Sequence, residues 1–162
     1  MFWPMFKANP TFEEILAVSS RLRPRDKLEI YPLMTVETPE QIAKDHFNDG
    51  SRPQVDWAVC LPSGPVVILG ATENFPGNWQ VYMFATEEYK LVIGHVTRFI
   101  KNEMIPALLD LKANYVDCLS ISGDKKAANW LKSLGAKKEA ALREYGKNKE
   151  TYNIYVWRPK YV

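Results

Sequence analysis

The stretch Tyr115–Arg158 decides the fold, and its sequence is YVDCLSISGDKKAANWLKSLGAKKEAALREYGKNKETYNIYVWR. The first part, Tyr115–Ile121, is short, apolar and bounded by polar residues, which is typical of a buried strand. A helix is predicted next from small and apolar residues at helical spacing: Ala127, Ala128, Leu131 and Leu134. Gly135 stands where a left-handed cap would end that helix. The aromatic and β-branched run Thr151–Arg158 then predicts a strand, and the segment GKNKE before it predicts a hairpin turn.

Length and composition indicate one folded, soluble domain over residues 1–162. The 162 residues are enough to bury a proper core, and 46% of them are hydrophobic, which excludes a disordered chain. The 21 basic and 19 acidic residues nearly balance, at a net charge of +2. Nothing in this balance is typical of a protein that binds nucleic acid.

Cysteine, histidine and apolar residues are placed as in a cytoplasmic protein without a metal. Cys60 and Cys118 both fall in predicted strands, where we expect buried thiols in a reducing compartment. His46 and His95 are the only histidines, and no Cys/His cluster accompanies them, so we expect no metal site. The start MFWPMF is too short for a signal peptide, and the apolar run PVVILGA is too short to span a membrane.

Two helices are predicted in the first 50 residues. Residues 1–10 form a degenerate first strand or a docking arm for a partner. Thr11 and Glu14 have capping-box spacing, so a helix begins there, and Pro24 ends it. The charged segment RPRDKLEI that follows is a solvated loop or a short helix. A second helix begins at Thr38, with Pro39 at its first position, and ends at Gly50.

The middle of the chain predicts an antiparallel meander followed by a long helix. Turn signals separate three apolar runs: VDWAVCL, VVILGA and WQVYMFAT. An apolar stripe at helical spacing then predicts a helix over residues 89–111, which Pro106 should kink or end near Ile105. A strand, a long helix and a strand make a right-handed crossover, so the strands at 79–86 and 115–121 should be parallel neighbours.

This order of elements resembles the GCN5-related N-acetyltransferase (GNAT) superfamily. Proteins of that superfamily commonly carry Asn-x-x-Ala, three residues and Tyr-x-x-x-Gly-Phe at this place. Ala127 and Gly135 match that motif, while Asp124, Leu131 and Ala136 take the positions of the Asn, Tyr and Phe. The resemblance implies an α/β (α+β) fold with a mixed, mostly antiparallel sheet of six or seven strands, about four helices and a splayed central parallel strand pair.

Length, the Leu-x-x-x-Gly-Ala variant and the closing hairpin also make the chain similar to small GNAT-like proteins of podophages, some of them internal virion proteins. That similarity implies a phage-encoded protein of the host cytoplasm. It also implies a partner among phage or host proteins.

The GNAT resemblance implies acetyl-CoA as cofactor and places its binding residues. Pantetheine would pair with the backbone of the fourth strand, here Phe84, Ala85 and Thr86. The pyrophosphate would lie at the start of the long helix, near Gly94 and His95, because helix N-termini bind phosphate. Asp124, at the motif's Asn position, belongs to the same set. The usual loop Gln/Arg-x-x-Gly-x-Gly/Ala is replaced here by EEYKLVIGHVTR, in which Gly94 is the one glycine left.

Three residues are candidates for acid–base chemistry. Amine acetylation needs a base for the ammonium proton and an acid for the leaving thiolate. Glu73, in the turn before the fourth strand, is the nearest candidate base. Leu131 stands where the family has its tyrosine acid, so Tyr145 or Tyr155 of the hairpin is the candidate acid.

Two functions stay open on these grounds. One is an acyl-CoA-dependent N-acyltransferase that acetylates an amine substrate. The other is a catalytically inactive GNAT-fold phage protein that acts through protein–protein contact in virion assembly or host takeover.

Overall fold

A computed structural model gives the structure of this protein, and it describes residues 3–158. The strands are β1 (Met5–Ala8), β2 (Gln54–Leu61), β3 (Gly64–Phe75), β4 (Asn78–Ala85), β5 (Tyr115–Ile121), β6 (Lys137–Leu142) and β7 (Tyr152–Trp157). The α-helices are α1 (Phe12–Ser19), α2 (Pro24–Ile30), α3 (Pro39–His46), α4 (Ile93–Phe99), α5 (Ile105–Asp110) and α6 (Lys125–Ser133). Short 3-10 turns, η1 (Tyr31–Leu33) and η2 (Glu87–Leu91), and a π-helical turn, η3 (Ile100–Met104), complete the described elements.

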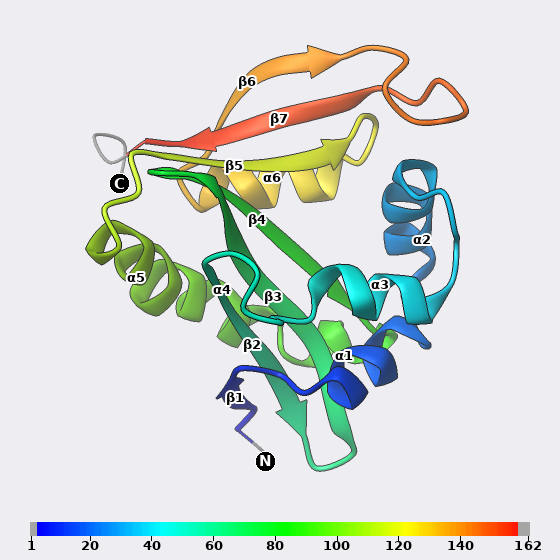
Figure 1. Ribbon diagram of the computed structural model, residues 1–162, viewed down its shortest axis with the longest axis vertical. Helices are drawn as coiled ribbons and strands as arrows, with labels where there is room; N and C mark the ends of the chain where they lie inside the picture. The colour runs from blue at the N-terminus through cyan, green and yellow to red at the C-terminus, as the bar shows by residue number, and fades with distance from the viewer. Residues whose placement is uncertain (1–2, 159–162) are drawn as a thin grey trace. The chain divides into compact units, whose positions relative to one another are not determined.

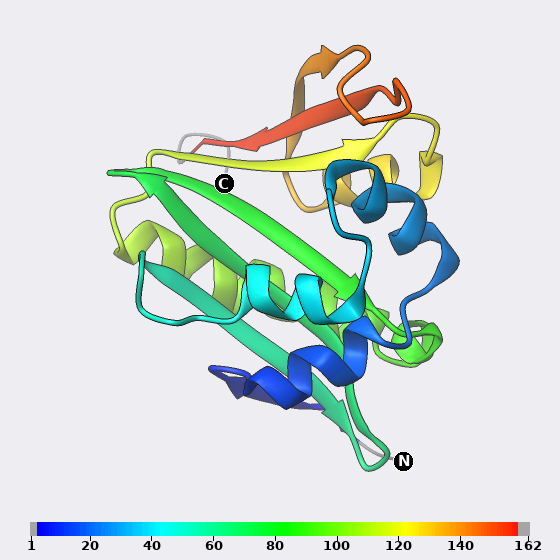
Figure 2. The same ribbon diagram turned by 45° about the vertical axis from the view of Figure 1, so that its right-hand side comes forward.

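The strands form one seven-stranded sheet in the order β1-β2-β3-β4-β5-β7-β6 (Figures 1 and 2). β1 pairs antiparallel with β2, β2 with β3, and β7 with both β5 and β6, whereas β4 and β5 are parallel. This arrangement confirms the predicted mixed sheet and its central parallel pair. The ladder between β4 and β5 has three residue pairs, from Asn78↔Tyr115 to Gln80↔Asp117, although the strands are eight and seven residues long.

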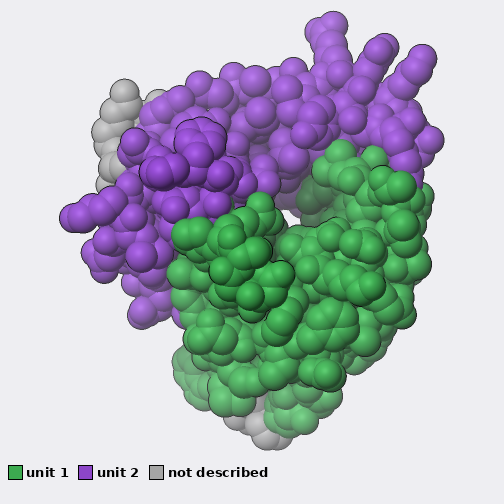
Figure 3. Space-filling view, in the orientation of Figure 1, with its two compact units in different colours: residues 1–72, 82–96 green, residues 73–81, 97–162 purple. Residues whose placement is uncertain are grey.

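The chain divides into two compact units, each made of two segments (Figure 3). Unit 1 comprises Met1–Thr72 and Tyr82–Val96, and unit 2 comprises Glu73–Val81 and Thr97–Val162. The prediction of a single domain over 1–162 stays a prediction. Within residues 1–10, the predicted degenerate strand is β1, while Met1 and Phe2 lie outside the described residues.

The core of unit 1 lies between the helices α1 and α3 and the antiparallel strands β2, β3 and β4. The predicted capping box starts α1, because the Thr11 hydroxyl accepts the Glu14 amide while the Glu14 carboxylate accepts the Thr11 amide. α1 and α3 lie across the meander (Figure 2). The buried side chains of this core are Ile15, Val18, Leu22, Ile42, Ala43, Ala58, Ile68 and Phe84.

Two predicted helix ends in unit 1 are wrong. α1 ends at Ser19, and Pro24 begins α2 instead of ending α1, since a proline at the first helical position forfeits no hydrogen bond. α3 ends at His46 instead of Gly50, because Phe47 already has extended backbone angles. The side chain of Asn48 accepts the Gly50 amide, so the segment after the helix is a turn of its own.

The long helix shows a second departure from the sequence prediction. The helix predicted over 89–111 is divided into η2, α4, η3 and α5, and α5 begins at Ile105 with Pro106 at its first turn. The Ile105 amide donates to the Ile100 carbonyl five residues back, which is the hydrogen bond of a π turn. The division adds one α-helix, and α2 adds another, to the four expected in the described residues.

The quoted C-terminal stretch folds as predicted in unit 2. β5 pairs with β7 over six residue pairs, from Val116↔Trp157 to Ile121↔Tyr152. α6 is capped by the Asp124 carboxylate, which accepts the Ala127 amide at 3.0 Å. Gly135 ends the helix with a φ of 96°, the left-handed conformation that glycine adopts without strain. The Trp157 indole N–H donates to the Leu134 carbonyl at 3.0 Å and so ties the hairpin to the helix end.

Candidate functional site

The backbone of β4 at Phe84–Thr86, the predicted pantetheine partner, lies in unit 1. Phe84 is 1% exposed, Ala85 0% and Thr86 1%. The Thr86 amide donates to the Val66 carbonyl of β3 at 2.9 Å. Because successive backbone groups of a strand point to opposite edges, the Ala85 amide and carbonyl face the edge of β4 away from β3.

Both backbone groups of Ala85 are already hydrogen-bonded to residues at the start of α2. The Ala85 amide donates to Oδ2 of Asp26 at 2.9 Å, and the Ala85 carbonyl accepts the Arg23 amide at 2.9 Å. Leu22 and Thr86 form an isolated antiparallel bridge beside these bonds. The chain around Arg23 therefore pairs with this edge of β4 as a very short strand would.

Two arginines hold the Asp26 carboxylate in place. The Arg23 guanidinium donates two bonds to it, both 2.9 Å long, and the Arg25 guanidinium donates one at 2.7 Å. The Arg23 guanidinium also lies 4.4 Å from the centre of the Tyr89 ring, and burial raises the pKa of Tyr89 to about 12. Asp26 is 1% exposed, yet its carboxylate accepts four hydrogen bonds, which is how a buried charge is stabilised. We call Arg23, Arg25 and Asp26 the α2 clasp.

The turn after β4, where the pyrophosphate was predicted, has an acidic 3-10 helix. Glu87 and Glu88 form the first turn of η2, and Glu88 accepts bonds from Arg21 at 3.0 Å and from Ser63 at 3.2 Å. Gly94 is the second residue of α4, is exposed, and lacks a positive φ. His95 packs edge-on against Trp3, with ring centres 4.8 Å apart. This turn therefore lacks the left-handed glycines that would bring backbone amides close to a phosphate.

Unit 1 also contains a second polar cluster, formed by the buried Asp56 and the partly buried Gln54, Tyr82 and His46. The Gln54 side-chain amide nitrogen lies 2.8 Å from the Tyr82 hydroxyl, 3.2 Å from Oδ2 of Asp56 and 2.7 Å from the His46 carbonyl. The His46 ring lies 4.6 Å from that of Tyr82 and 5.1 Å from that of Phe84. The cluster is therefore continuous with the predicted cofactor strand.

One oxygen of this cluster has no partner. Oδ1 of Asp56 is buried without a hydrogen bond, and burial raises the pKa of Asp56 from 3.8 to about 6. Burial also raises the pKa of Tyr82 and lowers that of His46. A buried carboxyl with a raised pKa is a candidate for proton transfer, whereas a structural carboxyl is usually fully paired.

The predicted residues Glu73, Tyr145 and Asp124 lie in unit 2 and do not form one cluster. The Glu73 carboxylate accepts the Gly77 amide at 3.0 Å and so closes the turn between β3 and β4. Tyr145 is 51% exposed in the loop after β6, and its ring meets that of Tyr152 edge-on at 5.8 Å. Asp124 caps α6. Each of the three therefore has a local structural role, and their catalytic or cofactor roles stay predictions.

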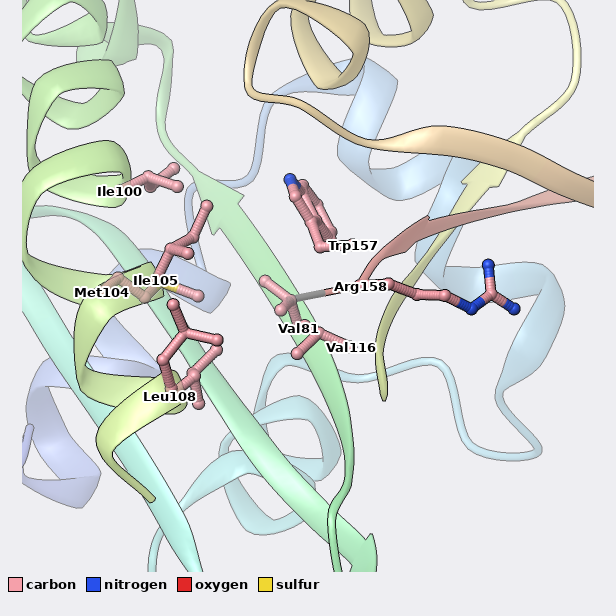
Figure 4. Close-up of a pocket in the computed structure, with 9 residues that line it drawn as sticks. Val81, Ile100, Met104, Ile105, Leu108, Val116, Trp157 and Arg158 are labelled. Atoms are coloured by element: carbon pink, nitrogen blue, oxygen red, sulfur yellow. The ribbon is translucent and has the colours of Figure 1, made fainter. Parts of the chain in front are cut away.

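Unit 2 also contains a small apolar cavity under α5 (Figure 4). Its lining residues are Val81, Ile100, Met104, Ile105, Leu108, Leu109, Val116, Trp157 and Arg158. The cavity volume is about 20 Å³, which is room for little more than a water molecule or a methyl group. It is therefore no cofactor site.

Within residues 3–158, no group of three or more His, Cys, Asp or Glu side chains is arranged to hold a metal ion. Cys60 and Cys118, expected to be buried, have intermediate exposure. No helix of the described part of the chain is long and apolar enough to cross a membrane.

The α2 clasp and Asp56 were missed by sequence reasoning. The segment RPRDKLEI has so many charges that it was interpreted as a solvated loop or short helix. Its signal was an aspartate that follows two arginines, Arg23 and Arg25, with a proline between them that can start a helix. Asp56 was part of the apolar run VDWAVCL, where a single polar residue suits the solvent face of a strand.

Solved structures with the same fold are N-acetyltransferases, while no family model and no curated protein matches the sequence. The chain is similar to the ribosomal-protein-S18-alanine N-acetyltransferase of Escherichia coli, with a TM-score of 0.71, 12% identity and coverage of 96% of this chain and 94% of that one. A variant of the spermidine N-acetyltransferase SpeG of Vibrio cholerae gives a TM-score of 0.70 and 12% identity, with 96% and 93% covered. The chain therefore has the GNAT fold.

Proposed function

We propose that this protein is an acyl-CoA-dependent N-acyltransferase that transfers an acetyl group to an amine. The observation that carries the proposal is the short parallel ladder between β4 and β5, with three residue pairs in strands of eight and seven residues. The resemblance to the GNAT superfamily implies that acetyl-CoA lies between two such strands. The two similar enzymes are named for spermidine and for an alanine of ribosomal protein S18, and both names describe acetylation at nitrogen.

The proposal names a reaction class and derives no step from the cofactor, because the predicted pantetheine partner Ala85 is hydrogen-bonded within the chain. Glu73 and Tyr145 are proposed as base and acid on the grounds given by the sequence. Asp56 is a further candidate base, because its buried Oδ1 has no partner.

Titration with acetyl-CoA during thermal unfolding tests this function. A ligand at 100 times its dissociation constant adds about 2.7 kcal/mol to the free energy of unfolding. We expect a rise in the unfolding midpoint that saturates with acetyl-CoA. Gly94→Glu should abolish the rise without changing the fold if the pyrophosphate lies at the start of α4. An unchanged midpoint at millimolar acetyl-CoA would contradict the proposed activity.

A second candidate function is a non-catalytic GNAT-fold protein that acts through protein contact. Two observations favour it: the α2 clasp engages Ala85, and Leu131, buried in α6, replaces the family's tyrosine acid. The similarity to small podophage proteins makes virion assembly or host takeover, in the host cytoplasm, the setting that we propose for it. An absence of any shift with acetyl-CoA, together with a stable complex with one phage or host protein, would support this candidate.

A further inference from the structure

We propose that the α2 clasp is a self-inhibitory contact, which must open before an acyl-CoA can pair with the backbone of Ala85. The inference rests on the proposed function. Both hydrogen-bonding groups of Ala85 face the edge of β4 away from β3, and the clasp engages both, through the Asp26 carboxylate and the Arg23 amide. A pantetheine amide pairing with Ala85 as a strand would have to replace these two bonds.

Helix α2 is held to unit 1 by one buried residue, while its other residues are exposed or partly buried. Asp26 is the one buried residue of α2, and Leu28 on the same helix is 68% exposed. No apolar side chain of α2 is fully buried, and Ile30 at its end is only partly buried against the core, so the clasp is the fully buried attachment of the helix to unit 1. An element with few buried apolar contacts opens at a low free-energy cost compared with global unfolding.

The chain on either side of α2 is suited to such an opening. α1 ends at Ser19, four residues before Arg23, and the buried members of its core cluster, Ile15 and Val18 among them, include no residue of α2. On the other side, Ile30 and Tyr31 pack only partly against the same core. The core of unit 1 can therefore stay folded while Arg23–Glu29 leaves Ala85.

The fraction of molecules in which the clasp is open sets the apparent affinity for acyl-CoA. If the open state is a fraction of the molecules, the apparent dissociation constant for acyl-CoA is the intrinsic value divided by that fraction. Weakening the clasp should therefore tighten binding without any new contact to the ligand. A clasp that never opens would instead give no binding by the wild-type protein.

Hydrogen exchange of the full-length, ¹⁵N-labelled protein with and without acetyl-CoA tests the displacement directly. Without ligand, the Arg23 and Ala85 amides should both be protected, because each donates a hydrogen bond within unit 1. With saturating acetyl-CoA, the Arg23 amide should lose protection, whereas the Ile15 amide inside α1 should keep it. Binding of acetyl-CoA with the Arg23 amide still protected would overturn the clasp and leave the proposed function standing.

Acetyl-CoA affinity of clasp variants gives the second measurement. Asp26→Asn keeps the side-chain size but removes the charge that two guanidiniums bind, and we expect acetyl-CoA to bind about tenfold more tightly. Arg23→Lys loses the two-bond fork while keeping the backbone amide, and it serves if Asp26→Asn does not fold. Arg52→Ala is the matched control, because Arg52 is an exposed arginine of unit 1 that belongs neither to the clasp nor to the η2 turn.

The outcomes separate the two proposals. Tighter binding by either clasp variant, with Arg52→Ala unchanged, supports the clasp. Binding by all forms with equal affinity overturns the clasp alone. A lack of acetyl-CoA binding by wild type and by both clasp variants overturns the clasp and the proposed function together.

Discussion

Two buried carboxyl groups of unit 1, Asp26 and Asp56, are in opposite situations although their exposure is nearly the same, 1% and 2%. Asp26 accepts four hydrogen bonds, from Arg23, Arg25 and the Ala85 amide. Asp56 has the Gln54 side chain near one oxygen and no partner for the other. Burial costs a carboxylate its hydration in both places, but only Asp26 recovers that cost from partners. The difference separates a carboxyl that stabilises structure from one that is kept in an unfavourable state.

The largest expected effect comes from breaking the paired side of this comparison. Asp26→Ala should lower the free energy of unfolding by about 2–4 kcal/mol, because it leaves the partly buried Arg23 and the Ala85 amide without their acceptor. Urea unfolding of the variant measures the loss. A loss no larger than that of an ordinary surface substitution would contradict this prediction. It would mean that water hydrogen-bonds Arg23 and the Ala85 amide in place of the carboxylate.

Asp56→Asn should act in the opposite direction and stabilise the protein at neutral pH, by as much as about 3 kcal/mol. The pKa of Asp56 rises from 3.8 to about 6 on folding, so the folded protein binds this proton more tightly than the unfolded chain. The stabilisation from Asp56 is therefore complete below pH 3.8 and is lost as the pH rises to about 6.

The pH dependence of unfolding, compared between wild type and Asp56→Asn, measures this effect. The difference between the two isolates Asp56 from His46, whose lowered pKa acts in the opposite direction. Asp110→Asn, at an exposed carboxyl, is the control. A flat difference between pH 4 and 6 would contradict the raised pKa.

Gly70→Ala should disturb the Asp56 cluster sterically. A Cβ atom there would lie 2.7 Å from the Tyr82 hydroxyl and 2.7 Å from the Asp56 Cβ. We expect a loss of about 1–2 kcal/mol in the free energy of unfolding, measured by thermal unfolding. Gly94→Ala is the contrasting glycine, since Gly94 is exposed within α4 and alanine there should stabilise by about 0.5–1 kcal/mol. Equal effects at both glycines would contradict the steric prediction, because they would mean that the Asp56 cluster accommodates a methyl group on residue 70.

The smallest effect is expected from Arg21→Ala, at an ion pair close to the clasp but open to solvent. The Arg21 and Glu88 side chains are 58% and 29% exposed, and their 3.0 Å contact is screened by water. The loss should stay below about 1 kcal/mol and vanish at high salt. A loss as large as that of Asp26→Ala would contradict this comparison, because it would mean that burial and the number of hydrogen bonds do not set the strength of these ion pairs.

Local patterns predicted most of the fold. Thr11 and Thr38 were expected to start helices, and each side chain accepts the amide that its spacing predicts. Gly135 was expected to be left-handed, and it is. The parallel neighbours over 79–86 and 115–121 followed from chain length and handedness, because a long helical connection returns the strand in the same direction. The ends of α1 and α3 were wrong because a proline or glycine signals a possible end and not the actual last hydrogen bond.

The candidate site could be predicted only in part. The sequence by itself determined the strand at Phe84–Thr86, since alternation and turn signals are local properties of the chain. It could not determine that the Ala85 amide is bound by Asp26, because the two residues are separated by 59 positions and meet only on folding. Nor could it show that Asp56 is buried with an unpartnered oxygen, because the solvation of a charge depends on every element packed around it. Periodicity in the sequence specifies which segments form strands and helices, and the tertiary structure alone decides which charges those segments pair and which they isolate.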